Sequence, residues 1–171
     1  MAVEKKISEL TAKSTELQPL DLLEVSEWNG ATFDTKSISG EKLILHTKVS
    51  LTAAQIKTIS TIPVSVIAAP GAGKVIEIVS AFLSFNYGTV TFDAAASFEV
   101  SLYTDTAGGR QYTTANNILN RTSSTIQTFD KDASTASQLV DNKAIFIDGG
   151  DDSTVGDSTI DLYIDYRIIT L

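Results

Sequence analysis

The C-terminal end of the chain alternates strictly between apolar and polar positions over residues 159–169. The apolar set is Ile160, Leu162, Ile164, Tyr166 and Ile168, and the set between them is Asp161, Tyr163, Asp165 and Arg167. A period of two residues is typical of a β-strand with one face in a core and the other in solvent. We therefore predict a strand in which Ile164 faces the core and Asp165 faces away.

Shorter segments of similar character recur along the chain, separated by turns rich in Gly, Asp and Asn. Strands are predicted, in chain order, at residues 61–68, 74–87, 89–92, 98–103, 125–129 and 143–148. Residues 74–87 are apolar on both faces, which indicates a strand buried in the core or in contact with another subunit. This strand pattern predicts an all-β fold, with a β-sandwich or jelly roll as its architecture.

The connections between these strands carry local signals of their own. Thr52 and Gln55 have the spacing of a capping box, which predicts a brief helix through Ile56. The glycines of residues 70–73 predict a hairpin turn. A second short helix is predicted at residues 115–119, within the part of the chain where the pattern is least regular.

The N-terminal segment differs from the rest because short apolar groups are set between charged runs. Residues 20–28 and 31–36 predict a hairpin around Asn29-Gly30, and residues 37–43 predict one helical turn. Two short strands bury too little apolar area to be stable alone, so this segment needs a partner surface. We predict an extended N-terminal docking arm with short β elements, residues 1–46, and a β-sandwich, jelly-roll-like body, residues 47–171.

Composition narrows the classes of partner. Of the 171 residues, 43% are hydrophobic and 20% are charged, which is typical of a globular protein with a real core. The formal net charge of −8 disfavours nucleic acid as a partner, because its phosphates are also negative. The absence of cysteine excludes disulfides and cysteine-based zinc sites. No run approaches the ~18 consecutive apolar residues of a membrane span, so we expect no membrane partner.

No group of residues makes a convincing catalytic or cofactor site. Residues 68–75 contain the Gly-Lys pair of a phosphate loop, but Ala68 and Val75 stand where that loop needs Gly and Ser or Thr. His46 is the single histidine, and no G-x-S-x-G nucleophile motif accompanies it. We therefore expect a protein that is not an enzyme and that has no cofactor and no metal site.

Six acidic residues and no Lys or Arg lie between residues 148 and 165. Clustered carboxylates could hold calcium or supply the acid pair of a glycosidase. The spacing does not match an EF-hand, and Asp and Gly are also the ordinary residues of β-turns, so we interpret residues 148–157 as a solvated turn. Tyr87, Tyr103 and Tyr112 could form a sugar-binding platform, which keeps a host surface glycan as an alternative partner.

Two parts of the chain resemble bacteriophage proteins. Residues 6–25 and 35–43 follow the pattern ISxL…DLLxV…T.K.S…L, which resembles an N-terminal module common in phage tail fibres, spikes and appendages. Residues 51–56, 62–76 and 156–169 are similar to phage structural domains with the patterns LTxAQI…P…APGAGKVI and GDSTLxVxVxYRxI. The first resemblance implies a small trimeric β element that docks a fibre onto a particle.

The resemblances imply a structural component of the virion, of the capsid decoration, head-fibre or tail-fibre type, assembled in the host cytoplasm. Its expected partners are further copies of itself in a homotrimer and other virion proteins, such as major capsid or tail components. The predicted docking and oligomer interface is the apolar set of the arm: Leu20, Leu22, Leu23, Val25, Trp28 and Phe33. The alternative is a host receptor-binding or glycan-binding head of a phage appendage.

Overall fold

The computed structural model describes residues 22–28, 33–39, 43–93, 99–104, 110–114, 117–131 and 139–171, and for residues 22–28, 33–39 and 110–111 it describes the backbone. The elements in chain order are β1 (Leu22–Trp28), β2 (Phe33–Ser39), β3 (Leu45–Leu51), α1 (Ala53–Lys57), β4 (Val64–Ile67), β5 (Lys74–Asn86), β6 (Val100–Thr104), β7 (Arg110–Thr113), β8 (Thr125–Thr128), β9 (Asp130–Lys131), β10 (Ile145–Gly149) and β11 (Thr159–Thr170). The described chain is almost entirely β-strand and loop, so the predicted all-β class is confirmed.

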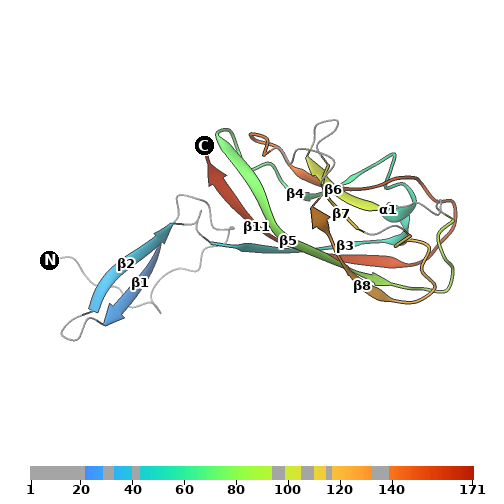
Figure 1. Ribbon diagram of the computed structural model, residues 1–171, viewed down its shortest axis with the longest axis horizontal. Helices are drawn as coiled ribbons and strands as arrows, with labels where there is room; N and C mark the ends of the chain where they lie inside the picture. Colours follow the sequence, from blue (N-terminus) through green and yellow to red (C-terminus); the bar gives the residue numbers. More distant parts are fainter. Residues whose placement is uncertain are drawn as a thin grey trace.

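Two antiparallel sheets form the body and face each other (Figure 1). One sheet has five strands in the order β4-β10-β6-β7-β9, and the other has four strands in the order β3-β11-β5-β8. All neighbouring strands in both sheets run antiparallel. The finer assignment of the body as a jelly roll stays a prediction.

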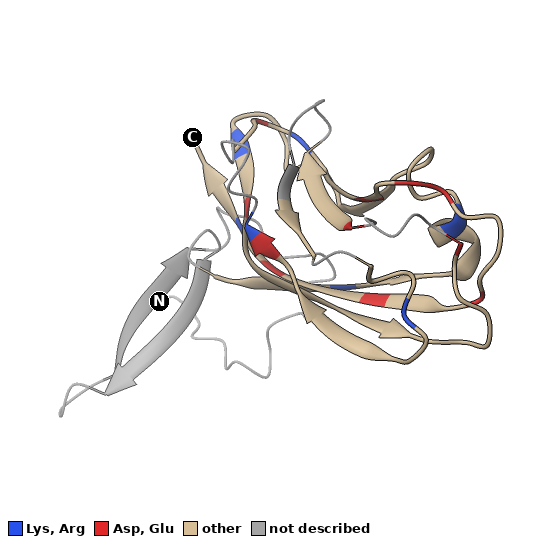
Figure 2. Cartoon of the chain, turned by 45° about the vertical axis from the view of Figure 1, so that its right-hand side comes forward, with Lys and Arg blue, Asp and Glu red and all other residues tan. Residues whose placement is uncertain are grey.

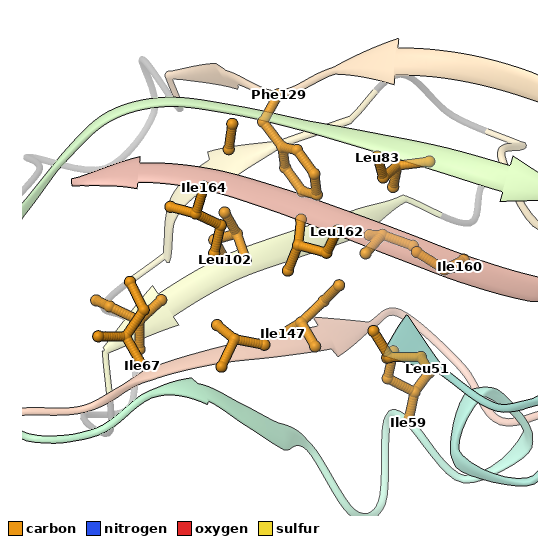
Figure 3. Packing of buried hydrophobic residues seen from close by; sticks show 14 of the residues in the cluster. Leu51, Ile59, Ile67, Leu83, Leu102, Phe129, Ile147, Ile160, Leu162 and Ile164 are labelled. Carbon is orange, nitrogen blue, oxygen red and sulfur yellow. The ribbon is translucent and has the colours of Figure 1, made fainter. Parts of the chain in front are cut away.

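The core lies between the two sheets (Figure 3). Leu102 and Ile147 come from the five-stranded sheet, and Leu83, Leu162 and Ile164 come from the four-stranded sheet. Each of these side chains is at most 1% exposed. Full burial of an aliphatic side chain of this size stabilises a fold by about 1.5–3 kcal/mol, so this layer is a main source of the body's stability.

Strand β11 is one of the two internal strands of the four-stranded sheet, because it pairs with β3 on one side and β5 on the other. Its alternate residues from Ile160 to Ile168 are all buried, and the residues between them are partly or fully exposed. The predicted strand and the predicted inward position of Ile164 are both confirmed.

Strand β5 contains a β-bulge that explains part of the apolar pattern of residues 74–87, although Val75 and Phe82 do not follow from it. Its register against β11 shifts so that Ser80 lies opposite Asp165 and Ile78 lies opposite Tyr166, which leaves Val79 as the extra residue. A one-residue insertion exchanges the two faces of a strand. Even-numbered residues such as Ile78 are therefore buried before the bulge, and odd-numbered residues such as Leu83 are buried after it.

The short helix α1 begins as the sequence predicts. The Thr52 hydroxyl accepts from the Gln55 amide, and the Gln55 side-chain oxygen accepts from the Thr52 amide at 3.0 Å. This capping box satisfies two amides that the first turn of the helix leaves unpaired. Ile56, the one buried residue of α1, packs into the core between the sheets.

Residues 70–73 form a turn, but the prediction of a hairpin was wrong. Gly71 and Gly73 have φ values of +97° and +74°, which L side chains rarely adopt. Strand β4 pairs with β10 in one sheet, whereas β5 pairs with β11 and β8 in the other. The turn therefore carries the chain from one sheet to the other.

Three further local predictions were wrong. Residues 89–92, predicted as a strand, form bends and irregular loop. Residues 37–39, predicted as the start of a helical turn, belong to β2, and residues 40–42 lie outside the described part of the chain. Residues 117–119 form a turn that starts with Asn117 at a φ of +69°, and residues 115–116 of the predicted helix are outside the description.

Candidate functional site

The predicted arm contains the hairpin that the sequence indicates. Strands β1 and β2 pair antiparallel, with Trp28 opposite Phe33 and Leu23 opposite Ile38. The residues predicted to form the docking interface are placed on these strands as follows: Leu22, Leu23, Val25 and Trp28 on β1, and Phe33 on β2. Leu20 and the turn Asn29-Gly30 lie outside the described residues, and the interface role of the whole set stays a prediction.

The acidic segment of residues 148–157 fixes loops at one end of the body. The Asp157 carboxylate accepts hydrogen bonds from the amides of Thr89 and Val90, each at 2.8 Å, and from the Thr89 hydroxyl at 2.6 Å. These bonds replace the strand pairing that the sequence predicts for residues 89–92. The side chain of Asp157 also fills the space beside Gly88, where a Cβ would lie 2.2 Å from its Oδ1 atom.

Two more aspartates connect distant loops in the same way. Asp152 accepts from the amide of Ser60 at 2.9 Å and from the amide and hydroxyl of Thr61. Asp93 accepts from the amide of Thr154 at 2.8 Å and from the hydroxyls of Ser153 and Thr154. These carboxylates are bonded to backbone and hydroxyl donors, an arrangement that stabilises loops.

The same bonds lower the pKa values of the aspartates and predict a loss of stability in acid. The pKa of Asp157 is held below its ordinary value by the Thr89 hydroxyl and nearby amides, that of Asp152 by Thr61, and that of Asp93 by Ser153 and Thr154. In the unfolded chain these groups titrate near the usual value of about 3.9. Below about pH 4 the unfolded state therefore binds more protons, so the stabilisation present above that pH is lost as the pH falls.

We expect the melting temperature to stay nearly constant between about pH 5 and 7 and to fall below about pH 4, as measured by circular dichroism. A double variant, Asp93→Asn and Asp157→Asn, should melt lower at neutral pH because it weakens these bonds. Its melting temperature should also fall less than that of the wild type when the pH is lowered below about 4. A wild-type melting temperature that rises as the pH is lowered from 5 to 3 would contradict the stabilising role of these carboxylates.

The carboxylates do not gather into a metal site within the described part of the chain. No group of three or more His, Cys, Asp or Glu side chains there is arranged to hold a metal ion. Asp161 is instead bonded to the Ser50 hydroxyl at 2.5 Å and lies 3.2 Å from the ammonium of Lys48. The interpretation of residues 148–157 as a solvated turn was wrong in part, because Asp148 and Gly149 belong to β10 and Ser153 is buried. The loop that follows β10 holds other loops through Asp152 and Asp157.

The Gly-Lys segment of residues 68–75 is bonded to another loop of the body. The amide of Gly71 donates to the Asn142 side chain, and the amide of Lys74 donates to Asp141, each at 3.0 Å. In a phosphate loop the corresponding amides face the phosphates, and a helix follows the lysine. Here Lys74 begins strand β5.

His46 lies in a polar row on the outer side of the four-stranded sheet. Its Nδ1 atom is 2.6 Å from Oδ1 of Asp165, and the Ser80 hydroxyl donates to Oδ2 of the same carboxylate at 2.8 Å. Nucleophilic catalysis would need the serine hydroxyl bonded to the imidazole. In this row the His46 imidazole and the Ser80 hydroxyl both bond to the Asp165 carboxylate, so no base is positioned against the Ser80 hydroxyl.

The three tyrosines considered for sugar binding do not form one platform. Tyr112 donates from its hydroxyl to the carbonyl of Ile78 at 2.9 Å, so its ring points across to the opposite sheet. Tyr103 lies on β6 with its ring 6.2 Å from that of Phe146. Tyr87 follows β5 and bonds the carbonyl of Thr89.

The structure shows a different apolar group, which sequence analysis did not single out. Phe82 on β5 and Tyr163 on β11 stack with ring centroids 4.7 Å apart, and the Lys48 ammonium lies 5.3 Å from the Tyr163 ring. Ile126 on the neighbouring strand β8 is 71% exposed, and Phe82 is 39% exposed. We call Phe82, Ile126 and Tyr163 the outer patch, because they lie on the side of the four-stranded sheet away from the core. The signal in the sequence was the second apolar face of residues 74–87.

In the described part of the chain, no helix is long and apolar enough to cross a bilayer.

Comparison with known proteins gives little similarity. No protein-family model matches the chain, and no curated protein matches it. Among solved structures, the chain is similar to one from the cyanophage Pam1 capsid asymmetric unit, with 97% of each chain covered, a TM-score of 0.40 and 14% sequence identity. Similarity at this level is too low to assign a family or a function.

Proposed function

We propose that this chain is a non-enzymatic structural component of a bacteriophage particle, of the decoration or fibre type. In this proposal the predicted arm attaches the protein to the particle through the residues that precede β3, and the β body is displayed as a homotrimer. Leu45 and His46, predicted as the end of the arm, pair with β11 as the start of β3 and so belong to the body. The observation that supports this proposal is that the strands of the arm and the strands of the body form separate sheets. Within the described residues, β1 and β2 pair with each other alone, and the nine strands of the body pair among themselves.

The hairpin of β1 and β2 has the character of a docking element. Successive residues of a strand belong to opposite faces, so Leu22 and Trp28 fall on one face and Leu23 and Val25 on the other. An isolated two-stranded hairpin is at best marginally stable in water. A hairpin with apolar residues on both faces is therefore expected to need covering surfaces, which a particle protein and neighbouring copies would supply.

The body supports a structural role through its interior and its loops. Its core is continuous between the two sheets, and the acidic loop residues are used to hold other loops. The resemblance of residues 6–25 and 35–43 to phage appendage modules supplies the proposed location. Attachment to major capsid or tail proteins, rather than chemistry on a substrate, is the function that this arrangement favours.

The proposal predicts that the arm is required for attachment to particles. A truncated chain that begins at Leu43 keeps all of β3 and both sheets of the body. We expect it to fold but to bind particles lacking this protein at least about tenfold more weakly than the full chain, a difference of about 1.4 kcal/mol or more. Occupancy is measured by cosedimentation and by cryo-electron microscopy of the particles. Full occupancy by the truncated chain would show that the arm is not the anchor.

A point variant in the full chain separates loss of the interface from loss of the arm. Trp28→Glu places a charge in the predicted interface and should reduce occupancy, because burying an unpaired charge is costly. Ile62→Glu is the matched control, since Ile62 is 63% exposed in the body and outside the arm. Mass spectrometry of purified virions that finds no peptide of this chain would overturn the proposed function as a whole.

A further inference from the structure

The outer patch is the part of the four-stranded sheet most suited to contact another protein. Tyr163 lies opposite Phe82 in the register of β11 and β5, and Ile126 lies opposite Ser84 on the neighbouring strand. The outer patch therefore extends over three adjacent strands of one sheet. Exposed apolar groups on neighbouring strands of one sheet are typical of contact surfaces.

The charges around the outer patch are paired with one another. Lys48 lies 3.2 Å from Asp161, and His46 lies 2.6 Å from Asp165. Arg167 forms an ion pair with Glu77 on the adjacent strand. In Figure 2 acidic and basic positions lie next to each other on the long strands of this sheet. The face thus carries two permanent cations and three carboxylates, besides the histidine, and is close to neutral.

This local balance contrasts with the chain as a whole, which has a formal net charge of −8. Two copies of so acidic a protein repel each other, and juxtaposed like charges across an interface cost several kcal/mol. A near-neutral face with exposed apolar side chains is where that repulsion is smallest. A strongly basic partner would instead be expected to face an acidic surface, so the charge pattern favours a second copy as the occupant.

We propose that the outer face of the four-stranded sheet is a self-association surface on which a second copy of this chain packs, with Phe82, Ile126 and Tyr163 at the contact. This inference rests on the proposed homo-oligomer and names its surface in the body, in addition to the arm. The stacked pair of Phe82 and Tyr163 presents a large apolar area at little cost in conformational entropy, because each ring is already held by the other. A closed rotational arrangement would cover the patch on every copy.

The test compares Ile126→Glu with Ile62→Glu in the full-length protein. Both substitutions place a carboxylate at a highly exposed isoleucine, so neither should disturb folding, which is checked by melting temperature. Sedimentation of the wild type at micromolar concentration should give about three times the chain mass of 18.3 kDa. Ile126→Glu should raise the dissociation constant roughly tenfold or more, and Ile62→Glu should leave it unchanged.

A second measurement uses the absence of cysteine from the sequence. Single variants Ile126→Cys and Ile62→Cys can each carry one nitroxide label, and distances between labels on different copies are measured by pulsed electron resonance. Short distances between copies for the label at position 126, and longer ones at position 62, would support the proposal. The opposite order would overturn it.

The remaining outcomes are distinct from failure of the proposed function. A wild type that stays monomeric on and off the particle overturns the self-association surface and the proposed homotrimer, whereas the proposed particle attachment through the arm would be unaffected. An Ile126→Glu protein that associates normally but no longer binds particles would show that another particle protein occupies this face. Loss of binding to immobilised host glycans in the same variant, with association unchanged, would assign the face to glycan recognition and would also overturn the inference.

Discussion

Replacing Ile164 with alanine should lower the free energy of unfolding by about 2–5 kcal/mol, the usual cost of removing a large aliphatic side chain from a packed core. Ile164 is 1% exposed and lies in the middle of β11. It is opposite Thr47 on β3 and Ala81 on β5, so it belongs to the centre of the four-stranded sheet and faces the opposite sheet across the core. The cavity that remains cannot close easily, because both neighbouring strands hold the backbone in place.

The measurement is urea denaturation at one fixed protein concentration, since an oligomer's apparent stability depends on concentration. Asp165→Ala is the matched control on the adjacent residue. The Asp165 side chain is 39% exposed, and its partners His46 and Ser80 are at the surface, so its loss should cost less than about 1 kcal/mol. Equal losses at both positions would show that both faces of β11 are buried in the native assembly.

The contrast between these two residues shows which features the sequence makes predictable. Strand β11 was predicted because its alternation is local and uninterrupted, and because each apolar position does enter the core. The capping box of α1 was predictable for a similar reason, since Thr52 and Gln55 satisfy each other within one turn. The same applies to the hairpin of β1 and β2, whose turn signal and two strands are adjacent in the chain.

Features that depend on distant parts of the chain could not be predicted. The sequence around residues 89–92 has the composition of a strand, but the bonds it makes are with Asp157, about seventy residues away. Residues 70–73 have the composition of a hairpin turn, but β4 finds its partner in β10, far along the chain. In both cases long-range pairing overrides a local preference, as tertiary context commonly does.

The sequence indicated a second apolar face on residues 74–87, but for a related reason it did not predict which residues form the outer patch. Phe82, Ile126 and Tyr163 are far apart in the sequence and become neighbours through the registers of β5 with β8 and β11. The bulge at Val79 adds to the difficulty, because it moves Phe82 to the outer face of a strand whose earlier even-numbered residues are buried. The apolar set of the arm, by contrast, was recognised from composition and from the resemblance to phage modules, and its role stays a prediction.

Gly156→Ala should destabilise the protein by roughly 2–5 kcal/mol, because backbone strain and overpacking act together at this residue. Gly156 has a φ of +114°, and a Cβ added there would lie 2.2 Å from the Phe92 ring. Phe92 is 3% exposed and belongs to the core cluster, so its ring cannot simply move into solvent.

Two control variants separate backbone strain from overpacking. Gly71→Ala, at a φ of +97° in open space, should show the strain alone. Gly150→Ala, with neither constraint, should stay within about 0.5 kcal/mol of the wild type. In a Phe92→Ala background the cost of Gly156→Ala should fall toward that of Gly71→Ala, measured as a double-mutant cycle in urea. An unchanged cost in that background would mean that the contact with Phe92 contributes nothing and that the backbone conformation alone requires glycine.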